Sequence, residues 1–420
     1  MYPFILIVPL IIYTVVAWKN FRLAVFLFLA CLPAYLLRLE IFSVPLTFLE
    51  LMLGVVTIFW IKNLWQKNTA RNFRWAEPWL IPISLLIIAG LIGVLISPET
   101  LPALGIFKAY ILESVLFFVI LFTTLKWHDD PEPALIFLGL GAIAVSVFAI
   151  FQRVTGLTIP IPWDVEGRVT SVFPYPNAVG LFLGPIIPLG FVTFWQMLEE
   201  KYFLKAWFWI LVTVSSTAAV IFSQTEAAWI AVPASLIVVS FFFKKTKSLA
   251  IVLIVPMIVI TLVVPAFRSK IFLQDYSGGV RLKQWEETAN MLRDNWLFGA
   301  GLSGYQKTLA PYHTYEEIEI FQYPHNIILN TWSELGLLGL LAFVATAWLV
   351  WKNLAAAKTE NSPHLWLAVA TSAALLEMVI HGLVDVPFFK NDLSILTAVC
   401  LALLAWSAHG PYARQNVKQQ

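Results

Sequence analysis

The amino-acid sequence predicts an all-α fold: a polytopic transmembrane bundle of 12–13 helical spans, with a long outward loop that contains an amphipathic helix. Of the 420 residues, 60% are hydrophobic and 12% are charged, and the mean hydropathy is +0.80. A soluble domain is about 25% charged, so a chain this apolar cannot cover its surface in water, and a soluble enzyme is excluded. The apolar runs are continuous and lack the alternation of a membrane barrel, and backbone groups in lipid are satisfied within helices.

Thirteen apolar runs follow one another along the chain, and we interpret them as membrane helices. The first three are short or closely joined, so the count is 12 or 13. Trp18, Trp60, Trp195 and Trp351 lie near the ends of runs, as expected for side chains at the membrane interface. The runs cover residues 4–18, 21–37, 41–61, 79–97, 103–125, 133–151, 177–196, 206–222, 227–243, 248–266, 326–351, 364–384 and 392–408.

The distribution of lysine and arginine indicates the orientation of the bundle. Three of these residues lie in segments 98–102, 152–176, 223–226 and 385–391. Fourteen lie in the alternating segments 62–78, 126–132, 197–205, 244–247 and 352–363 and in the C-terminal tail. The positive-inside rule places the cation-rich set in the cytoplasm, so the other set and the long segment 267–325 face outward. With 13 spans the N-terminus lies outside, and with 12 it lies inside.

This orientation divides the chain into four regions. Residues 1–150 form the N-terminal transmembrane helices, and residues 151–266 form central helices with an outward loop around Arg168. Residues 267–325 form the long extracytoplasmic loop, and residues 326–420 form the C-terminal transmembrane helices.

The outward segment 151–177 carries Arg153 and Arg168 on the side where short loops avoid cations. Prolines restrict its backbone and favour extended conformations. The pattern fits an ordinary loop whose arginines reach the membrane interface, and it equally fits a rigid loop that presents Arg168 to an anion. The prolines are Pro160, Pro162, Pro174 and Pro176.

A helix is expected within the long outward loop, starting at Ser277 and Gly278. Its apolar stripe has helical spacing, and we expect the helix to lie on the membrane surface or to cap the bundle. The stripe consists of Trp285, Ala289, Leu292 and Trp296. The opposite face, which we expect to be wet, consists of Lys283, Glu286, Glu287, Asn290 and Arg293.

Arg281 falls in the first turn of this expected helix. The helix macrodipole disfavours a cation there, which hints that the helix end and the guanidinium share an anion. An ordinary surface arginine is the plainer interpretation. The glycine-rich segment 298–304 that follows lacks the lysine and the strand context of a phosphate loop, so we interpret it as a tight turn.

His325 lies where the outward loop meets the next apolar run. A histidine at a helix start is most often a cap or a structural contact, yet this position also suits a proton acceptor at the membrane surface. Glu316, Glu317 and Glu319 are alternative bases or a solvated acidic run. Glu334 lies within the apolar run itself, where a buried carboxylate needs a partner.

No metal site is expected. His381 and Asp385 are four residues apart and can meet on one helix face, but no third ligand stands at a suitable spacing. The two cysteines, Cys31 and Cys400, both lie in apolar runs and do not indicate a disulfide or a metal pair.

Four motifs in order resemble the O-antigen ligase/polymerase family, over roughly residues 150–390. They are Arg168-Val-Thr-Ser-Val-Phe-Pro-Tyr-Pro-Asn177, Arg281-x-x-x-Trp285, Trp296-Leu-Phe-Gly-Ala-Gly-Leu-Ser-Gly-Tyr305, and Pro324-His325-Asn326 with Glu334-Leu-Gly336. Asp385-Val-Pro387 fits as well. One departure is the turn Ser223-Gln-Thr-Glu226-Ala, where members often carry an arginine and this sequence has an acid.

The resemblance implies a glycosyltransferase of the cell envelope, which builds lipopolysaccharide or another polysaccharide in the cytoplasmic (inner) membrane of a bacterium. The transfer would be metal-independent, free of cofactors and inverting, with the active site facing outward. The donor would be a glycan on undecaprenyl diphosphate. The acceptor hydroxyl would belong to a lipid A-core sugar, another lipid-linked repeat or a protein, and nucleic acid would not be a partner.

The resemblance also implies roles for individual residues. Arg168 and Arg281 would bind the diphosphate, and His325 would lie beside the attacking hydroxyl. Whether His325 is the base or only positions the acceptor stays open. Further candidates for the site are Arg153, Glu316, Glu319, Asn177 and Trp285.

Two other functional classes compete with this hypothesis. A polytopic secondary transporter would show inverted repeats and paired ionisable residues near the middle of the membrane, whereas this sequence has no visible repeat. A non-catalytic membrane scaffold would not need an outward loop with an arginine, a histidine and an amphipathic helix. Among enzymes, ligase, polymerase and protein glycosyltransferase stay open.

Overall fold

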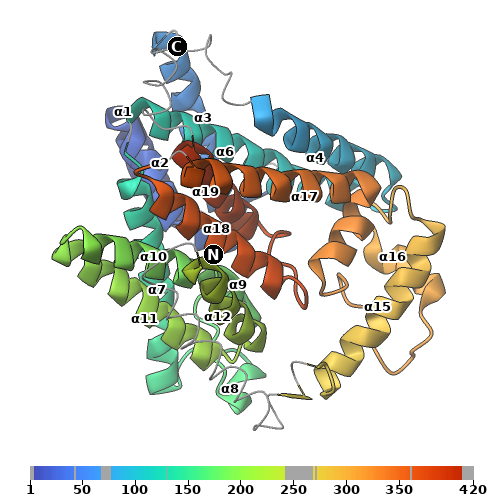
Figure 1. Ribbon diagram of the computed structural model, residues 1–420. Helices are drawn as coiled ribbons and strands as arrows, with labels where there is room; N and C mark the ends of the chain where they lie inside the picture. Colours follow the sequence, from blue (N-terminus) through green and yellow to red (C-terminus); the bar gives the residue numbers. More distant parts are fainter. Residues whose placement is uncertain are drawn as a thin grey trace.

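The computed structural model describes residues 4–41, 44–67, 77–128, 130–241, 268–269, 272–359 and 362–408, and these residues are predominantly helical (Figure 1). Eight segments within them are long and apolar enough to cross a membrane, and four apolar helices are shorter. The prediction of an all-α, multi-span bundle is therefore confirmed. The expected run at 248–266, like the cation-rich segment 244–247, lies outside the described residues.

The eight long segments correspond to runs that the sequence predicted. They are α3 (Phe48–Lys67), α4 (Glu77–Ile96), α5 (Thr100–Ile106) with η4 (Phe107–Leu112) and α6 (Glu113–His128), α7 (Glu132–Thr155), α9 (Asn177–Leu183) with α10 (Ile186–Glu199), α11 (Phe203–Ser223), α17 (Ile327–Thr359) and α19 (Asn391–Ala408). The four shorter helices are α1 (Phe4–Lys19), α2 (Phe21–Ala30), α12 (Glu226–Ser240) and α18 (Leu365–His381).

The expected run 21–37 is not one continuous span. Helix α2 ends at Ala30, the 3-10 helix η1 (Leu32–Leu36) follows, and the antiparallel hairpin β1 (Arg38–Ile41) and β2 (Val44–Thr47) pairs Arg38 with Thr47. Pro33 has no backbone N–H and cannot continue an α-helix. A capping box then starts α3, because Thr47 N donates to Glu50 Oε2 (2.6 Å) and Glu50 N donates to Thr47 Oγ1 (3.2 Å).

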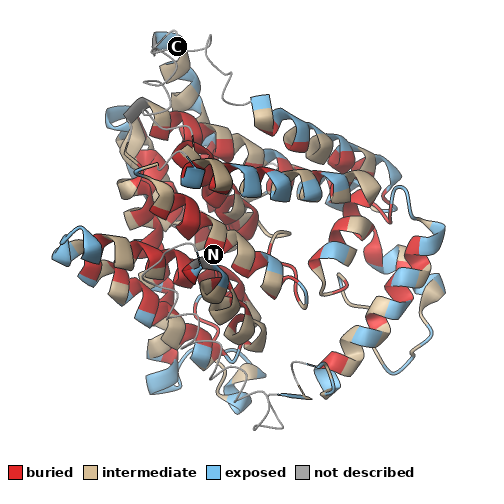
Figure 2. Ribbon diagram, in the orientation of Figure 1, coloured by how far each residue is buried: buried red, intermediate tan, exposed pale blue. Residues whose placement is uncertain are grey.

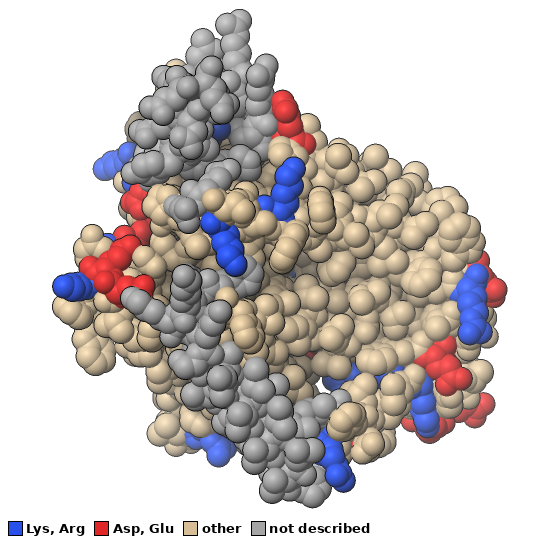
Figure 3. All heavy atoms as spheres, in the orientation of Figure 1, with Lys and Arg blue, Asp and Glu red and all other residues tan. Residues whose placement is uncertain are grey.

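The helices pack around α18 and α19, which run through the centre of the bundle (Figure 1). Helix α18 contacts α10, α12 and α19, helix α19 also contacts α6, and α17 lies along α4. Buried residues concentrate at this centre (Figure 2). Large apolar side chains are exposed on outer helices, such as Leu95 on α4 and Leu204 on α11, which suits a surface covered by lipid. Much of the face in Figure 3 carries no charged residue.

The long loop before α17 contains the expected helix, α15 (Tyr276–Asp294), beside the bundle, but the buried face of this helix differs from the prediction. Ala289 is exposed, and Trp296 lies beyond the helix end and is 54% exposed. Leu292 is the one residue of the predicted stripe that is buried; the buried residues of α15 are Gly278, Gln284, Glu287, Thr288, Met291 and Leu292. The predicted stripe was wrong because a later segment, 313–325, folds over the polar side of the helix and supplies partners for its side chains.

The glycine-rich segment 298–304 is a tight turn, as the sequence predicted. Gly299 and Gly301 have φ values of 73° and 78°, a conformation that favours glycine. Ala300 N donates to Ser333 O (2.6 Å) and Leu302 N to Gly93 O (3.1 Å), which fixes the turn against α17 and α4. The short helices α16 (Tyr305–Leu309) and η6 (Ala310–Tyr312) follow.

This turn also supplies the partner that the buried carboxylate of Glu334 requires. Ser303 N donates to Glu334 Oε2 at 2.7 Å. Helix α17 is kinked two residues later at Gly336 (φ 63°), and Leu337 N donates to Leu297 O (2.9 Å). This part of the long loop is therefore anchored on α17, the helix that begins two residues after His325.

We expect the substitution Gly299→Ala to destabilise the protein by about 2 kcal/mol or more. An added Cβ would lie 2.3 Å from Trp332 O and 2.4 Å from Ser333 O, and the positive φ is strained for alanine. Thermal unfolding in detergent measures the effect. The control is Gly279→Ala on α15, where an added Cβ meets nothing within 4 Å. The unfolding temperature of this variant should be unchanged or slightly higher. Equal transitions for both variants would contradict this account of the turn.

Candidate functional site

Arg281 and His325, 44 residues apart in the chain, line one cavity of about 460 Å³. It opens between the first turns of α15 and the segment that leads into α17. Of the expected acidic candidates, Glu317 and Glu319 line it, whereas Glu316 is exposed and is not among its described lining residues. The complete lining is Tyr276, Ser277, Val280, Arg281, Glu317, Ile318, Glu319, Phe321 and His325.

His325 is held in an uncommon backbone conformation, with φ at 47°, which costs free energy and recurs at functional sites. Its Nδ1 lies 3.4 Å from Oδ1 of Asp385. Its ring lies near the rings of Phe321 and Tyr323, with centroids 5.4 and 4.7 Å away. The interpretation of His325 as a helix cap was wrong, because Asn326 caps α17: its Oδ1 accepts from Ile328 N (3.0 Å) and Leu329 N (3.1 Å).

Asp385 is the carboxylate behind His325. It is buried and also accepts from Val386 N (2.9 Å). Burial raises the pKa of Asp385, but the adjacent His325 and His381 imidazoles outweigh this effect and hold the pKa below its usual value. Asp385 therefore stays ionised and can stabilise a positive charge on His325.

Arg281 lies in the second turn of α15, and the expectation that it lies in the first turn was wrong. The helix begins at Tyr276 with Asp275 as its N-cap, whose side chain accepts from Gly278 N (3.1 Å). Arg281 Nε donates to Val384 O (3.1 Å) and Nη1 donates to Ser277 Oγ (2.6 Å). Within the described residues, Nη2 has no hydrogen-bond partner, so it can serve a ligand in the cavity.

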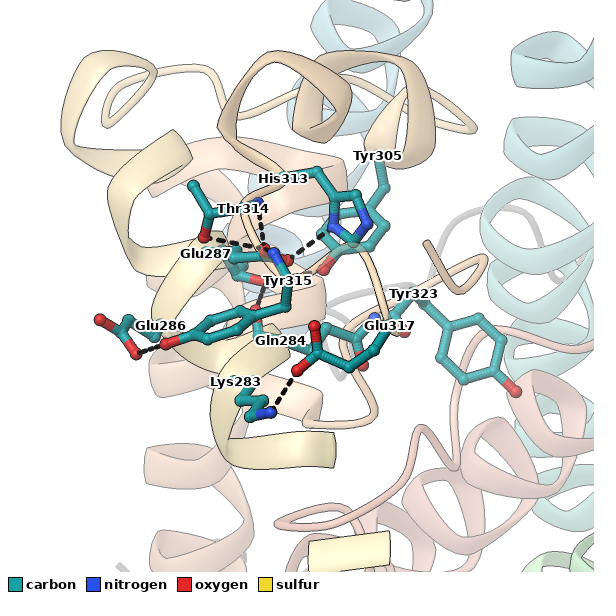
Figure 4. Close-up of polar contacts among 11 residues, drawn as sticks. Lys283, Gln284, Glu286, Glu287, Tyr305, His313, Thr314, Tyr315, Glu317 and Tyr323 are labelled. Carbon is teal, nitrogen blue, oxygen red and sulfur yellow. Dashed lines mark hydrogen bonds and ion pairs between the residues drawn. The ribbon is translucent and has the colours of Figure 1, made fainter. Parts of the chain in front are cut away.

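Glu287 on α15 fixes the segment that forms the far wall of the cavity (Figure 4). Its carboxylate accepts from Thr314 N (2.6 Å) and Tyr315 N (3.0 Å), and it contacts His313 Nδ1 at 3.1 Å. Burial raises the pKa of Glu287, but these donors outweigh the effect and leave the pKa below its usual value.

Further contacts from α15 hold the same segment up to His325. Trp285 Nε1 donates to Pro324 O (2.7 Å), and Gln284 Nε2 donates to Tyr323 O (3.1 Å). Lys283 pairs with Glu317. Trp285 therefore positions the backbone next to His325, which gives the Arg281-x-x-x-Trp285 spacing a structural reason: one helix contacts both sides of the cavity.

Arg168 lies in a second cluster. Its guanidinium donates to Ser223 O (3.1 Å) from Nε, and from Nη2 to Asn177 Oδ1 (2.9 Å) and Gln224 O (3.4 Å). Arg168 therefore hydrogen-bonds the turn at Ser223 and Gln224, which is the turn whose sequence departs from the family pattern. Glu166 lies 3.7 Å from its Nη1, at the end of the short helix α8 (Trp163–Glu166). Arg153 is exposed and donates to Gly167 O (3.3 Å).

The segment 383–390 connects the two clusters. Leu383 O accepts from Asn326 Nδ2 (2.9 Å), next to His325, and Val384 O accepts from Arg281. At its other end, the Lys390 ammonium lies 4.1 Å from the ring centre of Tyr175, two residues before Asn177. No hydrogen bond or ion pair joins Arg168 to the cavity lining in the described part of the chain, so the polar link runs through this segment.

Sequence reasoning missed two residues of this segment. We expected Asp385 to meet His381 within one helix, but α18 ends at His381, which lies 3.2 Å from the buried Glu377 instead. The motif Asp385-Val-Pro387 was the available signal for Asp385. No sequence signal pointed to Lys390, because its contact with Tyr175 joins residues more than 200 positions apart.

Cysteines and metal ligands do not gather in the described residues. Cys31 and Cys400 are free thiols, and no group of three or more His, Cys, Asp or Glu residues there could hold a metal ion.

We expect Glu287→Gln to loosen the segment 313–325. Both backbone amides donate to Glu287 Oε1, and Oε2 contacts His313 Nδ1. A neutral glutamine oxygen accepts more weakly than a carboxylate, and the substitution also removes the carboxylate partner of His313. Hydrogen exchange at Thr314 and Tyr315 should accelerate about 10-fold or more. The control is Glu286→Gln, because the Glu286 carboxylate makes one solvent-exposed hydrogen bond, with the Tyr315 hydroxyl (2.7 Å). This variant should change hydrogen exchange at the two amides little.

The pH dependence of this contact has a defined sign. The pKa of Glu287 is below its ordinary value of 4.5, so its contribution is complete above pH 4.5 and is lost as the pH falls through the lower folded-state pKa. Protection of the two amides, corrected for intrinsic exchange, should therefore decrease only below pH 4.5. A decrease above that value would contradict the assigned role.

Residues 211–344 match the family model described as O-antigen ligase. The matched region runs from α11 through the outward loop into α17, so it includes Arg281, Trp285 and His325 and excludes Arg168. No curated protein matches the chain significantly. The family match supports the assignment of this multi-pass membrane protein to the O-antigen ligase family.

Proposed function

We propose that this protein transfers a glycan from undecaprenyl diphosphate to an acceptor hydroxyl, without a metal and with inversion at the anomeric carbon. The observation that carries the proposal is the shared cavity of Arg281 and His325, within the region that matches the O-antigen ligase family. The reaction takes place at the outer face of a bacterial cytoplasmic membrane. This placement is supported by the small number of lysines and arginines in the short loops expected on the side of the site.

The chemistry suits two guanidiniums. The acceptor oxygen bonds to the anomeric carbon while the bond from that carbon to the diphosphate oxygen breaks, and the electron pair leaves with the diphosphate. This leaving group needs stabilisation of its growing negative charge. Arg281 offers its free Nη2, and Arg168 lies at the second cluster; both present planar donors that match phosphate oxygens.

His325 accepts the proton of the attacking hydroxyl. Its Nδ1 lies 3.4 Å from Asp385 Oδ1 and has no hydrogen-bond partner among the described residues. The negative charge of Asp385 at this distance favours the tautomer with hydrogen on Nδ1, which leaves Nε2 as the acceptor. The ionised Asp385 then stabilises the imidazolium that forms. Trp285 and Asn177 are positioning residues. Trp285 holds the backbone of Pro324 next to His325, and Asn177 orients the guanidinium of Arg168.

The lipid tail of the donor determines the depth at which the reaction takes place. The tail stays in the bilayer, so the diphosphate must lie at the boundary between membrane and water. The acceptor is a lipid A-core sugar, another lipid-linked repeat or a protein hydroxyl, and these three define ligase, polymerase and protein glycosyltransferase.

A transfer assay with the purified protein in detergent tests the proposal. It contains an undecaprenyl diphosphate-linked oligosaccharide, EDTA and the three acceptor classes in parallel. Transfer that survives chelation supports a metal-free glycosyltransferase, and the labelled acceptor identifies the subclass. Intact donor with every acceptor would overturn the proposal and would favour transport, which flux in proteoliposomes then measures.

We expect His325→Ala to reduce transfer by about 100-fold or more, because the base is lost, while binding of a fluorescent donor stays unchanged. Glu319→Gln is the matched comparison, since Glu319 lines the same cavity. It should retain most of the activity. The opposite result, loss in Glu319→Gln and transfer in His325→Ala, would make the glutamate the base.

Arg281→Lys should reduce transfer by at least about 10-fold, because a point charge cannot bond Val384 O and Ser277 Oγ and also present a planar donor to the phosphate. Initial rates at saturating acceptor measure this loss. The control is Arg293→Lys at the far end of α15, where the guanidinium bonds only Asn290 among the described residues (3.1 Å). Full activity of Arg281→Lys would remove Arg281 from the diphosphate site.

A further inference from the structure

Lys390 is a cation whose place between the two clusters is fixed by the backbone. It directly precedes α19, where Lys390 N donates to Phe388 O (2.8 Å) and Lys390 O accepts from Ser394 N (2.9 Å). Its ammonium lies over the ring of Tyr175, 4.1 Å from the ring centre. A cation held on an aromatic face keeps its N–H donors available on the opposite side.

The Lys390 ammonium has no ion-pair partner among the described residues. Within the described residues, no carboxylate oxygen lies within 4 Å of Nζ and no side-chain hydrogen bond uses it. Asp392 is close enough to raise the pKa of Lys390, but burial dominates and lowers it to about 8. A partly buried charge without a paired counter-charge costs free energy, so this position is suited to receive an anion.

Carboxylates lie near both arginines of the proposed donor site. Glu166 lies 3.7 Å from Arg168 Nη1. Glu319 lines the cavity with Arg281, as does Glu317, which pairs with Lys283. A diphosphate that leaves a sugar carries more negative charge than two such arginines balance. Lys390 has no carboxylate at ion-pair distance in the described chain and can supply the missing charge.

We propose that Lys390 is a third cation of the donor site, whose ammonium contacts the diphosphate between Arg168 and Arg281. Two contacts in the structure support this position. Tyr175, beneath Lys390, is two residues from Asn177, which accepts from Arg168. Val384 and Asp385, on the same segment as Lys390, contact Arg281 and His325. The inference rests on the proposed glycosyl transfer.

The experiment compares Lys390→Met with the wild-type protein in the transfer assay, using undecaprenyl diphosphate without a glycan as the inhibitor. Loss of a charge-assisted contact should raise the donor KM and the inhibition constant roughly 10-fold or more. The acceptor KM should stay unchanged, and Lys390→Arg should restore part of the affinity. Lys307→Met is the control, because Lys307 pairs with Glu99 (2.8 Å) outside the cavity lining and should leave both constants unchanged.

An unchanged inhibition constant in Lys390→Met would overturn the inference. If the donor KM rises at the same time, Lys390 contacts the glycan instead of the diphosphate. A wild-type protein that transfers nothing would instead contradict the proposed function. If Lys390→Met shows no thermal unfolding transition in detergent, the variant Tyr175→Leu is tested in its place. In Tyr175→Leu the ammonium of Lys390 loses the aromatic ring beneath it, so the inhibition constant should rise several-fold. An unchanged inhibition constant again overturns the inference.

Discussion

The structure depends on one constraint: wherever the chain leaves a regular helix in an apolar environment, its backbone polar groups need partners inside the protein. Charged side chains supply several of them. Arg168 donates to the carbonyls of Ser223 and Gln224, Arg281 donates to Val384 O, and Glu334 accepts from Ser303 N. The residues that complete the backbone are thereby fixed in place, which is what a binding site at a membrane boundary requires.

The same interactions prepare the electrostatics of the site. Each cation has a partner that orients it without using all of its donors, as Arg281 shows with its free Nη2. Asp385 holds His325 at an ion-pair distance and stays ionised. Helix α15 adds rigidity, because Glu287 and Trp285 bind the backbone of the segment that carries the histidine. Preorganised charges of this kind stabilise a transition state without reorganising during the reaction.

The sequence predicted the helices because their cause is local. Apolar runs of sufficient length form helices in lipid regardless of their neighbours. Twelve of the thirteen expected runs coincide with apolar helices in the described chain. Run 21–37 is the least complete, because only its first part forms a helix, α2. It also predicted the tight turn at Gly299. The buried face of α15 escaped prediction because segment 313–325, which covers it, comes later in the chain. Its polar residues find partners only after that segment has folded back.

By itself, the sequence determined the class of the fold, the long loop between two apolar runs and the residue types that carry charge near its ends. Only the tertiary structure decided which of these residues meet. It placed Arg281 and His325 in one cavity with Glu319, left Glu316 in solvent, and gave His325 its carboxylate, 60 residues further along the chain. The physical reason is that helix formation follows from local hydrophobicity, whereas charge pairing depends on distances between segments that only packing fixes.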